Sequence, residues 1–235
     1  MQNQSEQSFN FFSWFRKNYM VLLIMLLFFY LFFAFSAPVL MKLEFSKPGK
    51  FIYVIYSNFC HQFAHRSWFL FGEQLFYPSF IDADSGLRSL HDVFGIFPDN
   101  IQKSREIIGN KSAGYKVAIC QRDVAIYSAM LIFALIFQFS RKKIKKLPFW
   151  LWFLFAIIPI GIDGVWQLIS SSNISIISIF SHESTPEIRS ITGILFGFFT
   201  SWYLYPAIEE TFEDESAGII KKVKDEEGSV GITFK

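Results

Sequence analysis

YMVLLIMLLFFYLFFAFSAPVL, at residues 19–40, contains no charged side chain. As a helix with a rise of about 1.5 Å per residue, this stretch exceeds the roughly 30 Å apolar core of a bilayer. Inside lipid, its backbone N–H and C=O groups must find partners within the segment, which favours a helix. The stretch therefore predicts a membrane-spanning helix.

The end of this stretch also contains small residues, Ala34-Phe35-Ser36-Ala37, that resemble a signal-peptide cleavage site. The apolar run is longer than the usual 7–15-residue core of a signal peptide. We therefore favour a retained membrane anchor.

Three further apolar runs follow, at about residues 124–140, 148–169 and 191–208. They predict an all-α, polytopic integral membrane protein with four spans, and the lipid bilayer as its partner. We expect a single membrane domain over residues 1–210 and a mixed-charge cytoplasmic tail over 211–235. The net charge of +2 gives no footprint for nucleic acid, so we expect no nucleic-acid partner.

The densest basic cluster is Arg141-Lys142-Lys143-Ile144-Lys145-Lys146, between the second and third predicted spans. Short loops rich in Lys and Arg stay in the cytoplasm. This predicts a multi-pass protein of the cell membrane with both termini cytoplasmic. Residues 41–123 and 170–190 are then expected outside.

Residues 51–72 are apolar at both ends but contain Cys60-His61-Gln62-Phe63-Ala64-His65-Arg66-Ser67 in the middle. A true span would place two histidines and an arginine near the bilayer centre, which is costly. We predict an interfacial or re-entrant helix on the outer side. Residues 73–116 contain several Gly and Pro residues, and we expect an extracytoplasmic, loop-rich insertion with one or two short helices.

The middle of the 51–72 segment offers metal-binding side chains. On a helix, His61 and His65 would share a face at i and i+4, a spacing that suits two imidazoles on one metal ion. Cys60 would lie about 100° away around a helix with 3.6 residues per turn. The plainer alternative is interfacial packing with the polar groups among the lipid headgroups.

A second cluster, Cys120-Gln121-Arg122-Asp123, opens the second predicted span. A helix N-terminus lowers a thiol pKa and attracts anions. A thiolate, an anionic ligand or a metal site all fit this position. Alternatively, Asp123 caps the helix and Arg122 extends to the lipid headgroups.

Asp163 is the acid that lies well inside a predicted span, with Gln167 one turn further along the same helix face. An intramembrane acid indicates a functional site by default. The alternative is a buried pair with Arg189 or Arg122 that fixes helix packing. Nearby, Gly161 and Gly164 suggest a kink or a close helix contact.

In this order, the motifs resemble DUF2085, an uncharacterised prokaryotic membrane family. In this sequence the motif residues are Cys60, His61, Gln62, Arg66, Ser67; Cys120, Arg122, Asp123, Ile126, Tyr127; Asp163, Gly164, Gln167; Arg189, Thr192, Gly193 and Gly197. The resemblance covers roughly residues 50–75 and 115–205. His65 is not part of the family pattern, and residues 73–116 look like an insertion relative to it.

The resemblance implies a site without naming its reaction. In the family, the position of Asp123 alternates between Cys and Asp, which suits a metal ligand because thiolate and carboxylate both bind zinc. The implied zinc ligands are Cys60, His61 or His65, Cys120 and Asp123.

Three classes of function remain open. The first is a membrane enzyme with an outward-facing metal or thiolate site, acting on a lipid headgroup or a small anionic molecule. The second is a small transporter or binding protein that uses Asp163 and the arginines as a polar pathway. The third is a structural protein with a Cys60–Cys120 disulfide, which an oxidising exterior permits.

For the enzyme, the candidate catalytic residues are Gln62, Arg66, Arg122, Asp163, Gln167 and Arg189. We expect Arg66, Arg122 and Arg189 to converge on one anion, because guanidinium groups match the oxygens of carboxylates and phosphates. Independent contacts with lipid phosphates are the alternative.

Overall fold

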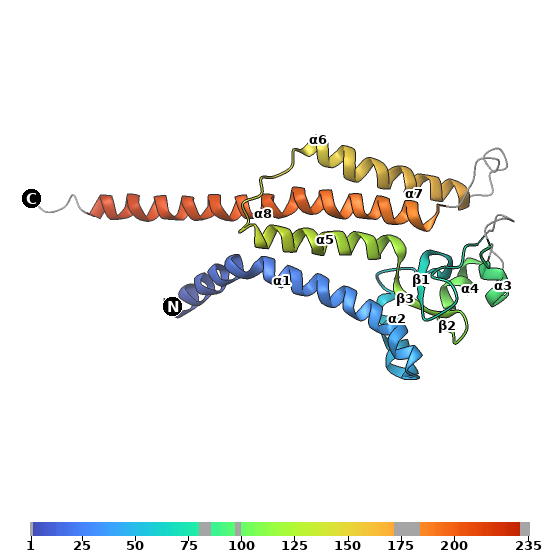
Figure 1. Cartoon of the computed structure of the whole chain (residues 1–235). Coiled ribbons are helices and arrows are strands. Elements are labelled where there is room, and N and C mark those ends of the chain that lie inside the picture. The colour runs from blue at the N-terminus through green and yellow to red at the C-terminus, as the bar shows by residue number, and fades with distance from the viewer. Residues whose placement is uncertain (1, 80–85, 97–99, 172–183, 231–235) are drawn as a thin grey trace, which may run out of the picture.

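Four long helical segments lie side by side in the computed structural model, which describes residues 2–79, 86–96, 100–171 and 184–230 (Figure 1). The segments are α1 (Gln2–Lys42), α5 (Gln121–Phe139), the continuous α6–η2–α7 unit (Phe149–Trp152, Phe153–Ile157, Ile158–Ser171) and α8 (Pro186–Val230). Each contains a stretch long and apolar enough to cross a membrane. The predicted polytopic helical membrane protein with four spans is confirmed.

The closest helix contact joins α5 to α8. Two glycines, Gly193 and Gly197, turn toward α5, and a Cβ at Gly197 would lie 2.3 Å from the Ile126 carbonyl oxygen. Small residues allow helix backbones to approach closely where lipid supplies no hydrophobic drive for association. Next to this contact, α1 packs against α5 and α8 through an apolar cluster that includes Met20, Phe133 and Tyr205.

The third span is less closely attached. The π-helical turn η2 precedes Pro159, whose missing N–H cannot complete the regular helical ladder. Contrary to the expected close contact, Cβ atoms added at Gly161 or Gly164 would meet nothing within 4 Å. Both glycines lie on a face of α7 that no other described helix covers.

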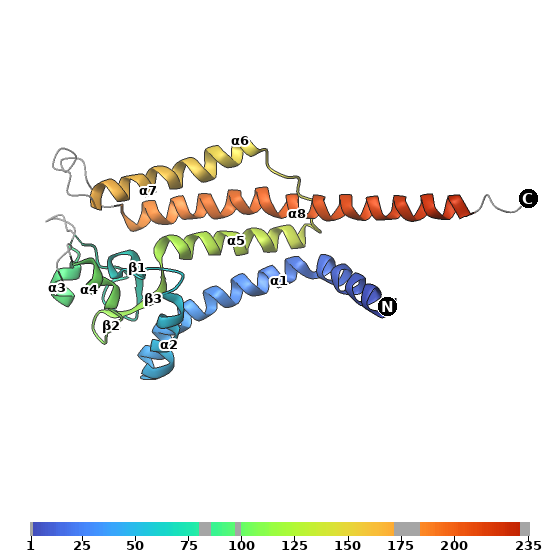
Figure 2. The ribbon, with the colours of Figure 1, turned by 180° about the vertical axis from the view of Figure 1, so that it is seen from behind.

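Between α1 and α5, the described residues of the stretch 43–120 form a compact unit at one end of the bundle, which we call the cap (Figure 2). It contains α2 (Ser46–Tyr56), η1 (Ala64–Arg66), β1 (Ser67–Leu70), α3 (Leu90–Phe94), α4 (Ile101–Glu106), β2 (Gly109–Asn110) and β3 (Gly114–Cys120). The chain is therefore not purely helical. A small antiparallel sheet, in the order β1-β3-β2, adds to the helices.

The predicted helix over residues 51–72 is wrong in its extent. α2 ends at Tyr56, the Cys60–Phe63 segment is irregular, and Ser67–Leu70 is a strand. α2 itself lies at an angle to the bundle (Figure 1) and buries Gly49, Tyr53 and Tyr56 while exposing Phe51 and Val54. This division of faces suits a helix at a membrane surface.

Strand pairing brings the two cysteine segments together. β1 pairs antiparallel with β3, so that Ser67 lies opposite Cys120. The Gln121 side-chain amide then donates to the Ser67 carbonyl oxygen at 3.3 Å. Because β1 follows the Cys60 segment and β3 leads directly into α5, this register places both cysteines at the junction of cap and bundle.

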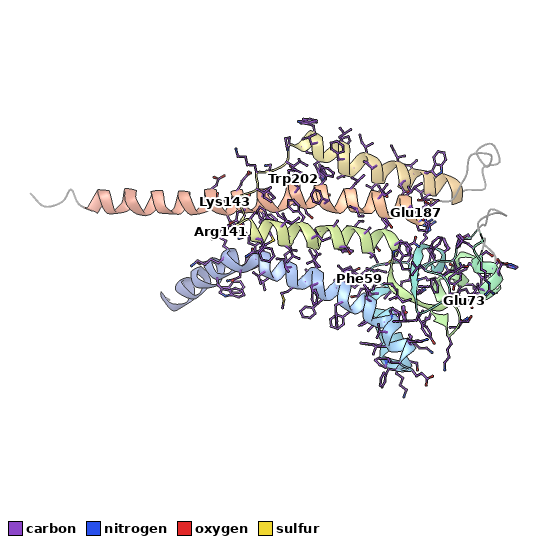
Figure 3. All side chains as sticks on the ribbon, in the orientation of Figure 1. Phe59, Glu73, Arg141, Lys143, Glu187 and Trp202 are labelled. Carbon is purple, nitrogen blue, oxygen red and sulfur yellow. The ribbon has the colours of Figure 1, made fainter. Side chains whose placement is uncertain are left out.

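The basic loop and the cap lie at opposite ends of the bundle. Arg141 and Lys143 lie near the end from which both termini emerge, whereas Glu187 lies next to the cap (Figure 3). The loop is attached to α8 through the Lys142–Glu209 ion pair at 2.9 Å and a hydrogen bond from the Trp202 indole to the Lys145 carbonyl. The positive-inside rule predicts that this end faces the cytoplasm and the cap faces outward, and this orientation stays a prediction.

Candidate functional site

A cavity of about 350 Å³ lies where the cap meets the bundle. Its walls come from the segment after α2, η1, α4, the start of α5, the end of α7 and the start of α8. The side chains of interest here are polar, and most were singled out from the sequence: Cys60, His61, Gln62, Arg66, Arg105, Cys120, Arg122, Asp123, Gln167 and Arg189. The fold therefore gathers residues from six segments around one space.

Three potential metal ligands meet at the edge of this cavity. The Cys60 and Cys120 sulfurs and a carboxylate oxygen of Asp123 all lie within 4.8 Å of one another. Cys120 is also the N-cap of α5, where its sulfur accepts a hydrogen bond from the Asp123 backbone N–H at 3.5 Å. This N-cap hydrogen bond thus fixes the spacing between Cys120 and Asp123.

The two thiols are in direct contact. The Cys120 thiol donates a hydrogen bond to the Cys60 sulfur, which lowers the pKa of Cys60 and raises the pKa of Cys120. Both residues are free cysteines rather than a disulfide. Cys60 therefore loses its proton to form a thiolate more readily than Cys120 does.

The two histidines do not form the expected pair on one helix face, because the segment between them is irregular. His61 lines the cavity and stacks on Phe63. His65 instead lies in η1, where its Nδ1 is 3.1 Å from the Ser104 hydroxyl. Burial lowers the pKa of His65 to about 3, with smaller contributions from Arg66 and Arg189. His65 supports the cap as a neutral ring and does not join the Cys60–Cys120–Asp123 cluster.

Asp163 has the bundle-facing position expected from its place in the third span. Its carboxylate is buried, forms an ion pair with Arg122, and accepts hydrogen bonds from the hydroxyls of Ser184 at 2.6 Å and Thr192 at 3.2 Å. An intramembrane charge needs such partners. These contacts join α5, α7 and α8 and fix where the Arg122 guanidinium lies.

Two further arginines reach the cavity from different elements. Arg66 donates to the Gln167 side-chain oxygen at 3.2 Å, which links the cap to α7. Arg189 is 2% exposed and donates to the His65 carbonyl at 3.3 Å and the Gln121 side chain at 3.4 Å. Arg66, Arg122 and Arg189 all line this cavity, and their convergence on one anion stays a prediction.

Gln62 holds the cysteine segment in shape. Its backbone adopts a positive φ of 56°, and its side-chain amide donates to the Tyr53 carbonyl at 2.9 Å. Its own carbonyl accepts from the buried amine of Lys116 at 2.6 Å. Lys116 also donates to the Arg105 carbonyl at 2.8 Å, and burial lowers the pKa of Lys116 to about 7. Lys116 therefore ties the Cys60 segment to α4.

Sequence reasoning missed three of these residues. Arg105 adds a fourth guanidinium to the cavity and donates to the Ser57 carbonyl at 3.0 Å. Lys116 and Ser184 provide buried contacts to the site. Alternating Tyr115, Val117 and Ile119 were a signal for β3, but nothing local to Arg105 or Ser184 marked them.

The site can be compared with known proteins. A family model described as "Predicted membrane protein (DUF2085)" matches residues 110–203. A relative from Methanocaldococcus jannaschii, "Uncharacterized protein MJ1492", is 30% identical over 201 residues, which cover 83% of this chain and 95% of the relative. The chain belongs to the DUF2085 family. No solved structure matches it.

The DUF2085 match divides the site unevenly. Residues 110–203 include Cys120, Asp123 and Asp163, together with Arg122 and Arg189. The segment from Cys60 to Arg66 precedes the matched range. In this chain the cap supplies that other half of the cavity through the pairing of β1 with β3.

Proposed function

We propose that this DUF2085 chain is a metal-dependent membrane enzyme that hydrolyses an anionic substrate at the extracytoplasmic surface of the cell membrane. The observation that carries the proposal is the meeting of Cys60, Cys120 and Asp123 within 4.8 Å at a cavity lined by arginines. Thiolate and carboxylate ligands suit zinc, and three protein ligands with one open position are typical of catalytic zinc.

Hydrolysis is the chemistry that fits such a centre. Zinc held by Cys60, Cys120 and Asp123 would lower the pKa of a water molecule to about 7 and so activate it as a nucleophile at neutral pH. In hydrolysis, the water oxygen would bond to the electrophilic atom of the substrate while the bond to the leaving oxygen breaks with its electron pair. His61, on the cavity wall, would accept the proton from the water and return it to the leaving oxygen. Water is the only co-reactant needed.

The arginines provide the substrate contacts in this proposal. Arg66, Arg122 and Arg189 come from η1, α5 and α8, and each presents a forked donor suited to carboxylate or phosphate oxygens. A lipid headgroup or a small anionic molecule satisfies this requirement. The cavity is lined by residues at the starts of α5 and α8, so it lies at one end of the spans, within reach of both sources.

The transport alternative has less support. The Asp163 carboxylate pairs with Arg122 and accepts hydrogen bonds from Ser184 and Thr192, all near the cap. Toward the other end, the described interior between α1, α5 and α8 consists largely of packed rings such as Phe133, Phe137 and Tyr205. This aromatic core is a poor route for a charged solute.

Elemental analysis of the full chain, purified in detergent without chelator, tests the proposal. We expect one equivalent of zinc per chain in the wild type and loss of at least 90% of it in Cys120→Ser and Asp123→Asn. Asp92→Asn is the matched control, because Asp92 lies in the capping box of α3 and is expected to leave the metal content unchanged.

Alkylation of the same samples under non-reducing conditions distinguishes the disulfide alternative. Two modifiable thiols after zinc removal support the metal site. A chain that lacks metal and takes up label only after reduction would show that Cys60 and Cys120 form a structural crosslink instead.

A further inference from the structure

One side of α2 is apolar and exposed. Phe51, Val54 and Ile55 are exposed on the helix, and Phe59, just beyond its end, is 72% exposed. The first three have the i, i+3, i+4 spacing of a single helix face. We call these four residues the α2 stripe. An exposed apolar surface of this kind marks contact with a membrane or another apolar partner.

The contacts between α2 and α1 show how deep the α2 stripe reaches. At the start of α2, a Cβ added at Gly49 would lie 2.9 Å from the Met41 sulfur of α1. At its end, the Tyr56 hydroxyl donates to the Tyr30 carbonyl oxygen at 2.6 Å, so α2 runs antiparallel to the last part of the first span. Tyr30 precedes Leu40, the end of the apolar run, by ten residues, or about 15 Å of helix. The C-terminal end of α2 thus lies beside membrane-spanning helix, where lipid is the neighbour that an exposed apolar stripe meets.

The other end of the same helix face is basic. Lys47 and Lys50 are exposed near the start of α2, four residues before Phe51 and Val54, respectively. Lysine side chains in such positions extend to lipid headgroups while the apolar part of the helix lies among acyl chains. The order along α2, basic first and apolar after, matches a helix that enters the bilayer from the headgroup layer with its C-terminal end deeper.

The α2 stripe leads directly to the cavity under the cap. Phe59 is both strongly exposed and part of the cavity wall, so this residue belongs to both surfaces. Figure 3 marks Phe59 at the cap end of the bundle. The next residue, Cys60, is one of the potential metal ligands. A surface that faces lipid is therefore continuous with the wall of the candidate site.

We infer that the substrate enters the cavity from the bilayer: it is an anionic lipid whose acyl chain lies along the α2 stripe and whose headgroup passes Phe59. The inference rests on the proposed function for the reaction and for the anionic headgroup. The choice of a lipid over a small soluble anion follows from the α2 stripe, because burial of an acyl chain against apolar side chains adds binding energy that a soluble anion lacks.

Photocrosslinking of the full chain in nanodiscs tests the lipid contact. The discs contain equal amounts of phosphatidylcholine and phosphatidylglycerol, and p-benzoylphenylalanine replaces Val54, Phe59 or His91 in separate samples. His91 is the control because it is exposed on α3, at the far end of the cap (Figure 1). We expect at least fivefold more lipid adduct at positions 54 and 59 than at 91. At position 59 we expect phosphatidylglycerol to exceed phosphatidylcholine at least threefold, and Arg105→Gln in the cavity wall to remove this preference.

Binding with and without acyl chains distinguishes a lipid from a soluble ligand. The detergent-purified chain is titrated with dioctanoyl phosphatidylglycerol and with glycerophosphoglycerol, which has the same headgroup and no chains. We expect at least tenfold tighter binding of the lipid, and Phe59→Ser to remove most of that difference. Leu75→Ser is the matched control: Leu75 is 63% exposed but lies outside the α2 stripe, so we expect no change.

Equal adduct yields at the three positions, or adducts at position 59 without preference for phosphatidylglycerol, overturn the inference. Equal affinity for the two titrated compounds does the same and identifies a soluble ligand. Thermal melting of each variant shows that it is folded. Zinc content, measured in the same samples, is scored separately. Bound zinc without the lipid contacts overturns only the lipid assignment, whereas the lipid contacts without zinc overturn only the metal-dependent function.

Discussion

The two ends of the helix bundle each have a charged hollow of similar volume, but their charges are arranged differently. The hollow next to the termini, about 320 Å³, is lined by Arg16, Lys17 and Lys142 together with Glu209 and Glu213. The cavity under the cap, about 350 Å³, has four arginines, one lining carboxylate and two thiols. Size alone therefore does not distinguish the two ends; the gathering of arginines with potential metal ligands under the cap does.

The charged groups at the terminal end fasten helices to one another. Glu209 of α8 accepts from the Tyr19 hydroxyl of α1 at 2.6 Å and pairs with Lys142 of the basic loop at 2.9 Å. The Lys142 amine also lies over the Tyr19 ring at 4.3 Å. These groups satisfy one another, whereas the arginines under the cap come from four separate elements and line one cavity together with Cys60, Cys120 and Asp123. The comparison teaches that charged groups paired between helices indicate a clamp, whereas arginines gathered with potential metal ligands around one cavity indicate a candidate ligand site.

The largest loss of stability is expected from Gly197→Leu, which would break the contact between α5 and α8 that connects the two ends of the bundle. A Cβ at Gly197 would lie 2.3 Å from the Ile126 carbonyl oxygen, and backbone cannot yield as a side chain does. We expect a loss of about 4 kcal/mol or more in the free energy of unfolding, among the largest for single substitutions. Unfolding by sodium dodecyl sulfate in mixed micelles measures it. Gly161→Leu, at an open position, is the control, and an equal loss there would contradict the packing role.

Asp163→Asn compared with Glu209→Gln tests the two ends directly. The Asp163 carboxylate is only 3% exposed, and its replacement breaks the ion pair with Arg122 and weakens the hydrogen bonds from Ser184 and Thr192, which is expected to cost about 3 kcal/mol. The Glu209 carboxylate is 20% exposed, so water compensates more for the loss of its charge and we expect about 1 kcal/mol. The same micelle assay applies. Similar losses at both positions would remove the contrast between the clamp and the cavity.

Much of the bundle was predictable because lipid imposes simple rules. The run at residues 19–40 and the three later runs predicted the spans, since each falls within the range of about 17 to 25 apolar residues that a helix needs to cross the apolar core. The cap was harder because it is held by contacts distant in sequence. The apolar residues of Ser67–Leu70 suit a strand or a helix equally, and only pairing with Gly114–Cys120 decides between them.

The same distinction applies to the site. Arg66, Arg122 and Arg189 each lie near a predicted span or interfacial segment, so their meeting followed from the topology. His65 was assigned to the metal site on the assumption of a continuous helix, and the irregular Cys60–Phe63 segment removes that assumption. Arg105 was missed because only the tertiary position of α4 brings it to the cavity.

A smaller effect is expected from the pH dependence of the cap, which His65 provides. The folded protein holds the pKa of His65 at about 3, below its ordinary value of 6.5, so the unfolded chain binds more protons between these values. The contribution of neutral His65 to the free energy of unfolding is fully present above pH 6.5 and is lost progressively as the pH falls toward 3. By linkage the loss at pH 5 is about 2 kcal/mol.

Melting temperatures of the wild type and His65→Gln, recorded between pH 7.5 and pH 5, measure this effect. The glutamine variant cannot titrate and is expected to show a flatter profile, although its absolute stability is lower because the contact with Ser104 changes. Parallel profiles for the two proteins would show that His65 is not responsible for the pH dependence.

The smallest effect is expected for the hydrogen bond that attaches the third span to α8, away from both charged hollows. The Trp152 indole donates to the Thr200 hydroxyl at 3.1 Å. Neutral hydrogen bonds between helices in a membrane average about 0.6 kcal/mol, because the separated helices also find partners. A double-mutant cycle of Trp152→Phe and Thr200→Val, with unfolding measured in mixed micelles, is expected to give a coupling energy near that value. A coupling as large as the loss in Asp163→Asn would mean that neutral contacts, and not the charged junction under the cap, position the third span.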